Sequence, residues 1–280
     1  MTTVGQLERR TQDRVIRLLR DRLGYDYLGN WIDRPDNRNL EMAILRRWLA
    51  RRGYAPTLID RALYQLEKAA ALGEGRHLYE ANRAVYELLR YGVKIKPAAG
   101  EQTQTVWLID WAHPEQNDFA VAEEVSVQGE VKKRPDIVLY VNGIALGVLE
   151  LKRSTVSVSE GIRQNLGNQQ KAFIRNFFST VQLIMAGNDT EGLRYGVIET
   201  PEKYYVAWRE EDPAWQPGGP GEKYLPAANC IGGETLLDCA LLRLLAKARF
   251  LELVHDFIAF DGGIKKIARP NQYFAVRAAQ

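Results

Sequence analysis

The sequence predicts an α/β (α+β) fold, in which a mixed sheet is flanked by helices and preceded by an N-terminal helical region. Three observations predict it. Apolar residues recur at helical spacing through the first 92 residues, short β-branched and aromatic runs follow between residues 105 and 151, and a helical stretch begins near residue 157. This order is typical of helices packed on a sheet. It divides the chain into regions 1–92, 93–235 and 236–280.

Four helices are expected in the N-terminal region. Residues 4–23, 39–52 and 57–72 interleave apolar and charged side chains at helical spacing, with Pro56 and Thr57 as start signals. The fourth helix, in the segment HLYEANRAVYELLRYG, ends at Gly92.

The periodicity then changes to that of strands. Strands are expected at residues 105–110, 119–127, 136–141, 144–151, 181–186, 195–199 and 204–209. A helix is expected at 157–177, and composition indicates a loop at 213–221. Residues 236–260 have the pattern of one long helix.

Composition and charge exclude several classes of protein. No run approaches the roughly 18 apolar residues of a membrane helix, and the N-terminus lacks a signal-peptide core, so a cytoplasmic protein without membrane contact is expected. Two cysteines and three scattered histidines lie at no zinc-ligand spacing. The net charge is +3, yet residues 1–61 hold 13 arginines and no lysine against 8 acidic residues. This flank fits contact with phosphates or a partner protein, and solvated helix faces explain it equally well.

The segment RPDIVLYVNGIALGVLELKRS, residues 134–154, carries the candidate chemistry. Its two apolar runs predict interior strands joined by a turn at Asn142 and Gly143. Glu150 and Lys152 stand two apart and therefore share a face, whereas Leu151 points into the opposite layer. Burial of these two charged groups is costly unless they have partners.

The register of the hairpin decides whether Asp136 joins them. A two-residue loop pairs residue 141 with 144, which puts Asp136 opposite Leu149 and off the face of Glu150. A three-residue loop with Gly143 in the left-handed conformation pairs 140 with 144 and returns Asp136 to that face. A shared site therefore predicts the longer loop or a bulge elsewhere in the hairpin.

Two carboxylates and an amine on one face suit a particular reaction. Carboxylate oxygens are hard ligands suited to Mg²⁺, or to Mn²⁺ in its place. A nearby ammonium can orient an attacking water and offset charge on a phosphorane-like transition state. Asp136, Glu150 and Lys152 thus predict metal-dependent hydrolysis of phosphodiesters. The alternative is a buried salt bridge, Glu150 or Asp136 with Lys152, that serves stability only.

The segment resembles the PD-(D/E)xK nuclease core of restriction-endonuclease-like folds, and its flanks resemble the N-terminal part of the motor (R) subunit of type I restriction enzymes. The resemblance covers nearly the whole chain, through LGYDYLGNW at 23–31, NRNLE at 37–41, ANRAVYELLRYGVKI at 81–95 and NFFSTVQLIMAGNDTEGLRYGVIETPEKYYVAW at 176–208. It implies that Asp136 and Glu150 bind Mg²⁺ with the carbonyl of Leu151 as a further ligand, and that Lys152 activates water. It also implies duplex DNA as the substrate, and methyltransferase and specificity subunits as partners.

The helix after the core departs from the family pattern at one position. The family carries a glutamine and a tyrosine four residues apart there. Gln164 matches the glutamine, but Asn168 stands where the tyrosine is expected. That difference shifts the expected contact with the DNA backbone toward Gln169, Gln170 or Lys171, and a purely solvated role explains Gln164 equally well.

Three further residues are candidates for the site. Arg134, directly before the PD pair, is a candidate for contact with DNA. In the resemblance, an acidic residue from the preceding helix often completes the metal site. Glu80 and Glu87 are the candidates, although ordinary surface salt bridges also explain both.

Motifs for ATP are absent from the 280 residues. No GxxxxGK[ST] phosphate loop occurs, so this chain is expected neither to bind nor to hydrolyse ATP, which the resemblance assigns to the full-length enzyme. The ending RPNQYFAVRAAQ resembles the lead-in to a motor domain, so a longer protein is expected.

Two other functions compete with the nuclease hypothesis. The arginine-rich residues 1–61 favour a catalytically idle docking module that joins the motor to the methyltransferase and specificity subunits. A metal-independent acid/base hydrolase using Asp136 and Glu150 leaves Lys152 without a clear task.

Overall fold

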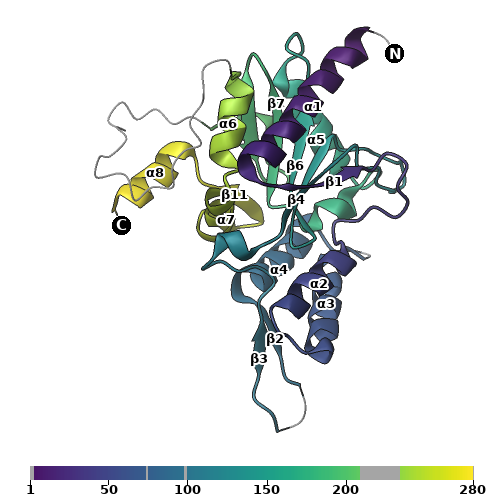
Figure 1. The fold of residues 1–280 in the computed structure, drawn as a ribbon, viewed down its shortest axis with the longest axis vertical. Helices are drawn as coiled ribbons and strands as arrows, with labels where there is room; N and C mark the ends of the chain where they lie inside the picture. The colour runs from purple at the N-terminus through teal and green to yellow at the C-terminus, as the bar shows by residue number, and fades with distance from the viewer. Residues whose placement is uncertain (1–2, 74, 98–99, 209–233, 280) are drawn as a thin grey trace.

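A mixed seven-stranded sheet forms the centre of the molecule (Figure 1). The computed structural model describes residues 3–73, 75–97, 100–208 and 234–279. The sheet order is β1-β4-β5-β6-β7-β8-β9, with β1/β4 and β6/β7 parallel and the other neighbours antiparallel. The strands are β1 (Asp26–Asn30), β4 (Phe119–Glu123), β5 (Ile137–Val141), β6 (Ile144–Leu151), β7 (Leu183–Asn188), β8 (Gly192–Gly196) and β9 (Val206–Ala207).

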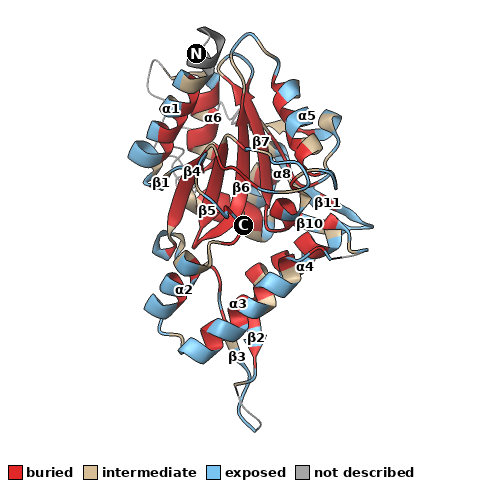
Figure 2. Cartoon of the chain, turned by 90° about the vertical axis from the view of Figure 1, so that its right-hand side faces the viewer, coloured by how far each residue is buried: buried red, intermediate tan, exposed pale blue. Residues whose placement is uncertain are grey.

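Helices cover both faces of this sheet (Figure 2). Helices α1 (Thr3–Leu23) and α6 (Leu236–Leu244) pack on one face, where β6 contributes Leu149 and Leu151 to the core. Helix α5 (Val158–Asn168) and the 3₁₀ helix η2 (Arg175–Ser179) cover the other face, where Val148 lies. Because successive residues of a strand point to opposite faces, these two core clusters fix which side chains of β5 and β6 face α5.

The remaining elements surround one end of the sheet and its α1 side. They are α2 (Met42–Arg51), α3 (Pro56–Ala70), α4 (Leu78–Tyr91), the hairpin of β2 (Val93–Ile95) and β3 (Gln104–Val106), η1 (Pro114–Gln116), η3 (Glu202–Tyr204), α7 (Lys247–Asp256), the hairpin of β10 (Ile258–Asp261) and β11 (Ile264–Ile267), and α8 (Pro270–Ala279). In Figure 1, α2, α3, α4 and the β2–β3 hairpin lie at the lower end of the sheet.

The predicted α/β class is confirmed, as are the four N-terminal helices and the interior position of β5 and β6. The first 92 residues also contribute β1, which the sequence analysis missed. Its sequence, DYLGN, lacks apolar alternation because β1 is an edge strand, half-exposed and paired only with β4. Residues of all three expected regions share one core cluster, from Leu19 through Leu149 to Leu251.

Several predicted elements have other bounds in the structure, and three of them differ most. The helix expected to reach residue 177 ends at Asn168, and its apolar continuation packs through η2 instead. The strand expected at 105–110 ends at Val106. The single helix expected at 236–260 is α6, α7 and the start of β10, because Ala246 has an extended backbone that interrupts the helix. A continuous apolar pattern cannot reveal such a break.

The loop expected at 213–221 lies outside the described residues. None of the described helices has the length and apolar character needed to cross a membrane.

Candidate metal centre

The β5–β6 hairpin turns at Asn142 and Gly143, both with positive φ (54° and 86°). Val141 pairs with Ile144, so the loop has two residues. The register then shifts, because Leu139 pairs with Gly147 whereas Tyr140 pairs with Ala145. This bulge is the second of the two geometries predicted for a shared site, and the three-residue loop does not occur.

The bulge brings Asp136 to the face of Glu150. Beyond it, Ile137 pairs with Leu149, so Asp136 comes opposite Glu150. Val138 is two residues from Asp136 and Val148 is two residues from Glu150, so each shares a face with its acidic neighbour. Both valines lie in the core beneath α5. The two acidic residues and Lys152 therefore share the α5 face, and Leu151 points into the opposite layer, as predicted.

Hydrogen bonds hold both the carboxyl and the backbone carbonyl of Asp136. Its Oδ2 accepts a hydrogen bond from the N–H of Leu151 at 2.7 Å. Its carbonyl accepts hydrogen bonds from the N–H of Glu124 at 2.8 Å and from Nε2 of Gln12, in α1, at 3.3 Å. Burial raises the pKa of the Asp136 carboxyl, and the Leu151 N–H and the Lys152 charge oppose that rise.

Glu150 is fully buried, and only one of its oxygens has a hydrogen-bond donor. Oε2 accepts from Nε2 of Gln164 at 2.7 Å, whereas Oε1 has no donor among the described residues. Burial raises the pKa of the Glu150 carboxyl well above its ordinary value, and the neighbouring Asp136 raises it further. A like-charged pair with an unsatisfied buried oxygen costs stability, which is the usual sign of a site built for a ligand.

Lys152 reaches the same cluster through Gln164. Its Nζ donates to Oε1 of Gln164 at 2.8 Å and lies 4.0 Å from Oε2 of Glu150, and its side chain is 15% exposed. The Gln164 amide thus bridges the amine and the carboxylate, and it holds the amine near the carboxylate without a close ion pair.

Gly161 allows α5 to approach this cluster. A Cβ at this position would lie 3.0 Å from Cβ of Ala186 and 3.5 Å from Cβ of Glu150. Only a residue without a side chain lets the helix pack this closely, and the close packing carries Gln164 to its two partners.

The donor set fits a hard divalent cation. It comprises two carboxylates in contact, one with an unsatisfied oxygen, and no nitrogen or sulfur ligand. In the described part of the chain, no group of three or more His, Cys, Asp or Glu side chains is placed to hold a metal. Mg²⁺ retains several waters and takes one or two carboxylates, so two protein carboxylates suffice.

The structure does not bring Glu80 or Glu87 to this cluster. Glu80 accepts a hydrogen bond from the N–H of His77, and Glu87 is paired with Arg83. Helix α4 contacts the segment before β7, as the Asn82 amide shows by donating to the carbonyls of residues 178, 179 and 181. The carboxylate cluster lies beside the other end of β7.

The remaining predicted residues are divided between the surface and the core. Arg134 is half-exposed and its Nε lies 2.6 Å from Oε2 of Glu124. Asn168 and Gln169 are buried, so neither presents its side chain to solvent. Of the alternatives named for DNA contact, Gln170 and Lys171 are exposed.

Glu124 follows β4 and lies next to Asp136, and it was not among the residues predicted from the sequence. Its φ of 52° turns the chain at the end of the strand, and its charge raises the pKa of both Asp136 and Glu150. Glu123 beside it points to the α1 face, where Arg9, Gln12, Tyr27 and Asn30 all donate to its carboxylate. The signal was two consecutive acidic residues at the end of an apolar strand.

The chain is similar to known proteins over most of its length. Residues 5–203 match the family described as type I restriction enzyme R protein N terminus. The HindI endonuclease subunit of a type I restriction enzyme from Haemophilus influenzae is 27% identical over 234 residues, which cover 80% of this chain and 21% of the relative. A protein of Methanocaldococcus jannaschii, provisionally named the MjaIXP endonuclease subunit of a type I restriction enzyme, is 26% identical over 208 residues, 69% of this chain and 19% of the relative.

The chain therefore spans about a fifth of the length of these relatives. The family match covers more than half of the chain and includes Asp136, Glu150, Lys152 and Gln164. This protein belongs to the family of type I restriction enzyme R protein N-terminal regions.

Proposed function

We propose that the carboxylate cluster hydrolyses phosphodiester bonds of duplex DNA with the aid of Mg²⁺, as the nuclease part of a type I restriction complex. The observation that carries this proposal is the pair of carboxyls that the strand register places opposite each other on one sheet face, with Oε1 of Glu150 buried and without a donor among the described residues. A divalent cation supplies the positive charge that such a pair lacks.

Each residue has a separate task in this mechanism. Asp136 and Glu150 would hold the cation, with the carbonyl of Leu151 as a further ligand, and the cation would polarise the phosphate and lower the pKa of a bound water. Lys152 positions the attacking water and offsets negative charge in the transition state. Gln164 orients both Lys152 and Glu150 through its amide, and so acts as a positioning residue.

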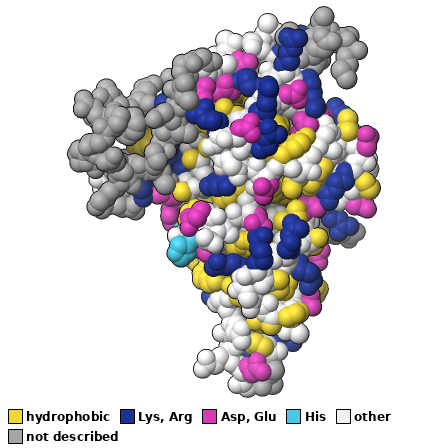
Figure 3. Space-filling model, in the orientation of Figure 1, with side chains coloured by type: hydrophobic (Ala, Val, Ile, Leu, Met, Phe, Trp, Pro, Cys, Tyr) yellow, Lys and Arg dark blue, Asp and Glu magenta, His cyan; other side chains and the backbone are white. Residues whose placement is uncertain are grey.

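The competing functions have less support. A salt bridge that serves stability alone is less favoured, because Nζ of Lys152 lies 4.0 Å from Glu150 and a second carboxylate, Asp136, stands opposite Glu150. A docking surface needs available charge, yet eight of the 13 arginines in residues 1–61 form ion pairs with carboxylates. Figure 3 shows basic and acidic side chains interleaved over the α1 face.

The proposal extends to the whole enzyme in which this region resides. ATP would serve a motor domain of the full-length subunit, and methyltransferase and specificity subunits would select the DNA. The complex would act in the cytoplasm, and the isolated region would cleave DNA poorly because no motor delivers the substrate.

Metal binding provides the direct test of the site. We expect Mn²⁺ soaked into crystals to give anomalous density between Asp136 and Glu150, and titration with Mn²⁺ to give one binding site that is lost in Asp136→Ala. Asp118→Ala, which removes a carboxylate paired with Arg51 at the surface, is the matched control. Density elsewhere, or unchanged binding by Asp136→Ala, would show that the carboxylates do not hold the cation.

Lys152→Ala should separate metal binding from chemistry. Lys152 donates a hydrogen bond to Gln164 and does not itself bind the metal in this proposal, so the affinity for Mn²⁺ should persist. DNA cleavage by the assembled restriction complex should fall about 10²-fold. The measurement is the rate of plasmid cleavage at saturating Mg²⁺. Cleavage at the wild-type rate would remove Lys152 from the mechanism.

Gln164→Ala should have a smaller effect of the same kind. Loss of the amide frees Lys152 and leaves Oε2 of Glu150 without its donor, so we expect kcat for cleavage to fall about 10–100-fold. The KM for DNA should not change, because a positioning residue does not touch the substrate. A raised KM with unchanged kcat would instead indicate direct contact between Gln164 and DNA.

A further inference from the structure

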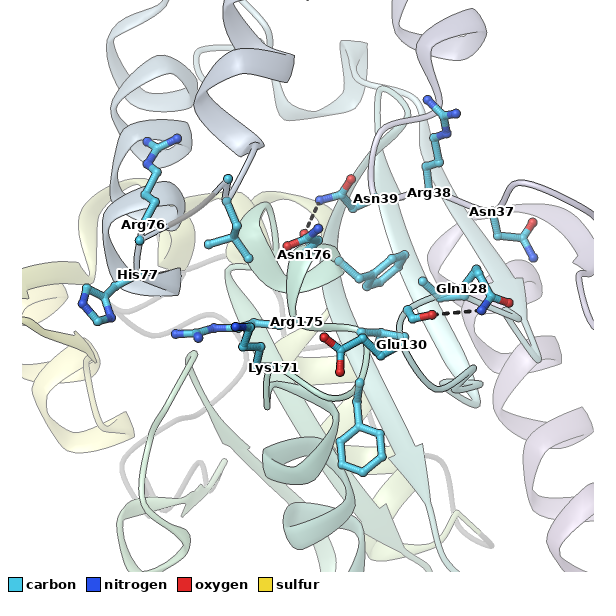
Figure 4. A pocket seen from close by; sticks show the side chains of 18 residues that line it. Asn37, Arg38, Asn39, Arg76, His77, Gln128, Glu130, Lys171, Arg175 and Asn176 are labelled. Carbon is cyan, nitrogen blue, oxygen red and sulfur yellow. Dashed lines mark hydrogen bonds between the residues drawn. The ribbon is translucent and has the colours of Figure 1, made fainter.

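A pocket of about 920 Å³ opens on the α5 side of the sheet (Figure 4). Its walls come from the segment after β1, the connection between α3 and α4, the loop at 127–130, and the chain from 171 to 177. Val127, Ile174 and Phe177 form an apolar floor that belongs to the core beneath α5. The polar character of the pocket therefore lies in its rim.

Positive charge dominates that rim. Arg38, Arg76, Lys171 and Arg175 line the pocket, and Glu130 is the one acidic residue among its described lining residues. In Figure 4, Arg175 extends toward the side that carries Arg76 and His77.

Few of these charges are neutralised by carboxylates. Within the described part of the chain, Arg38 and Lys171 are exposed and form no ion pair. Arg76 donates to the carbonyls of residues 68, 69 and 71, and Arg175 lies 3.5 Å from Glu199. Eight of the 13 arginines in residues 1–61 are paired, whereas Arg38, at this pocket, is among the five that form no ion pair within the described part of the chain.

Two of the amide NH2 groups at the pocket donate within the protein. Nδ2 of Asn39 donates to the carbonyl of Asn176 and to Oγ of Ser179. Nδ2 of Asn37 donates to three carbonyls. Base edges are read by such amides and by bidentate arginines, whereas phosphates are held by charge. The pocket therefore has the chemistry for a phosphate backbone.

A short ladder connects the pocket to the carboxylate cluster. The N–H groups of Glu124, Val125 and Val127 donate to the carbonyls of Asp136, Pro135 and Lys133. Glu124 lies next to Asp136, and Val127 lines the pocket. The three residues from Glu124 to Val127 span at most about 10 Å, which corresponds to about three phosphates of one DNA strand at roughly 3.4 Å of helix axis per phosphate.

We propose that this cationic pocket binds the phosphate backbone of duplex DNA beside the bond that is cut, independently of base sequence. The inference rests on the proposed function for its choice of ligand. It adds a contact that the carboxylate cluster does not provide, because Arg38 and Lys171 come from segments on either side of the pocket and lie outside that cluster.

The test is DNA binding by the 280-residue protein in EDTA, measured by fluorescence anisotropy with two labelled duplexes of unrelated sequence. The double substitution Arg38→Ala/Lys171→Ala should weaken binding about tenfold for both duplexes, and should reduce the slope of log K against log salt by about 2. Both side chains are exposed, so the thermal unfolding midpoint should not change.

The matched control is Arg10→Ala/Arg17→Ala, which removes the same charge from exposed positions on α1, across the sheet. This control should bind DNA as the wild type does. An equal loss in both double variants would show a general effect of charge and overturn the proposal, as would a loss confined to one duplex sequence. Because the assay contains no metal and no cleavage step, its failure is distinct from failure of Mn²⁺ to bind at Asp136 and Glu150.

Discussion

Glu150→Gln should abolish DNA cleavage and at the same time stabilise the folded protein. The expected loss of cleavage is about 10³-fold or more, because a neutral amide replaces a carboxylate that would hold the metal. The free energy of unfolding in EDTA should rise by about 0.5–2 kcal/mol. Activity and stability are expected to change in opposite directions, because the buried carboxylate that catalysis needs destabilises the fold.

The contacts of Glu150 explain the gain in stability. In the wild type, one buried carboxyl faces another, and Oε1 has no donor. Glutamine occupies the same volume and can accept from Gln164 through its oxygen while its Nε2 donates to Asp136. The substitution removes the like-charge contact and replaces the orphaned oxygen with a donor.

The gain should increase with pH. The pKa of the Glu150 carboxyl is raised in the folded state, so the folded protein binds more protons than the unfolded chain above the ordinary carboxyl range. Wild-type stability therefore falls as pH rises from the unfolded pKa through the raised folded pKa, whereas the amide of the Glu150→Gln variant does not titrate. Thermal or urea unfolding of both proteins in EDTA across this range measures the difference.

Metal should reverse the order of stability. Mn²⁺ binds the folded wild type and raises its unfolding midpoint, whereas Glu150→Gln should show little change. Glu160→Gln is the control, because Glu160 is exposed and pairs with Arg163 on the outer face of α5. Cleavage at the wild-type rate by Glu150→Gln, or a loss of stability equal to that of Glu150→Ala, would contradict the assigned role.

Gly143→Ala should cause the largest loss of stability among these substitutions, about 2–4 kcal/mol. Its φ is 86°, and an added Cβ would lie 2.7 Å from the carbonyl oxygen of Glu41 and 2.9 Å from Cβ of Ile44. The N-terminus of α2 rests on this turn, since the N–H of Glu41 donates to the carbonyl of Gly143 at 2.7 Å. The substitution therefore strains the backbone and moves either the hairpin or α2.

Gly53→Ala provides a matched control. Its φ of 83° is nearly the same, but no atom lies within 4 Å of an added Cβ. Only the backbone strain remains, so the cost should be about 1 kcal/mol. Urea denaturation of both variants separates strain from collision, and equal losses in the two would show that the packing of α2 on the turn contributes nothing.

The candidate site was predictable because it is local in sequence. The strands around Asp136 and Glu150 are strongly apolar, their turn is Asn-Gly, and two residues of spacing place Glu150 and Lys152 on one face. The same reasoning predicts an altered register, through either a three-residue loop or a bulge, since only such a register brings the carboxylates together, and the structure has the bulge. Its position at Leu146 did not follow, because it depends on packing in the layers that β5 and β6 meet on each side.

Residues that join the site from a distance could not be inferred in this way. Glu124 reaches Asp136 through pairing between strands, and Gln12 through the packing of α1 across the sheet. Glu80 and Glu87 were candidates from helical spacing alone, and the packing of α4 places them at the other end of β7. Spacing within one element cannot specify which end of the sheet that element approaches.

The sequence by itself determined the class of fold, the order of most elements and the three residues of the hairpin, because local periodicity and turn chemistry are written in neighbouring residues. Only the tertiary structure decided how α5 brings Gln164 between Lys152 and Glu150. It also decided how Arg38, Arg76 and the chain from 171 to 175 come together around a cationic pocket. These arrangements depend on contacts between residues far apart in the chain, which are selected by core packing rather than by local pattern.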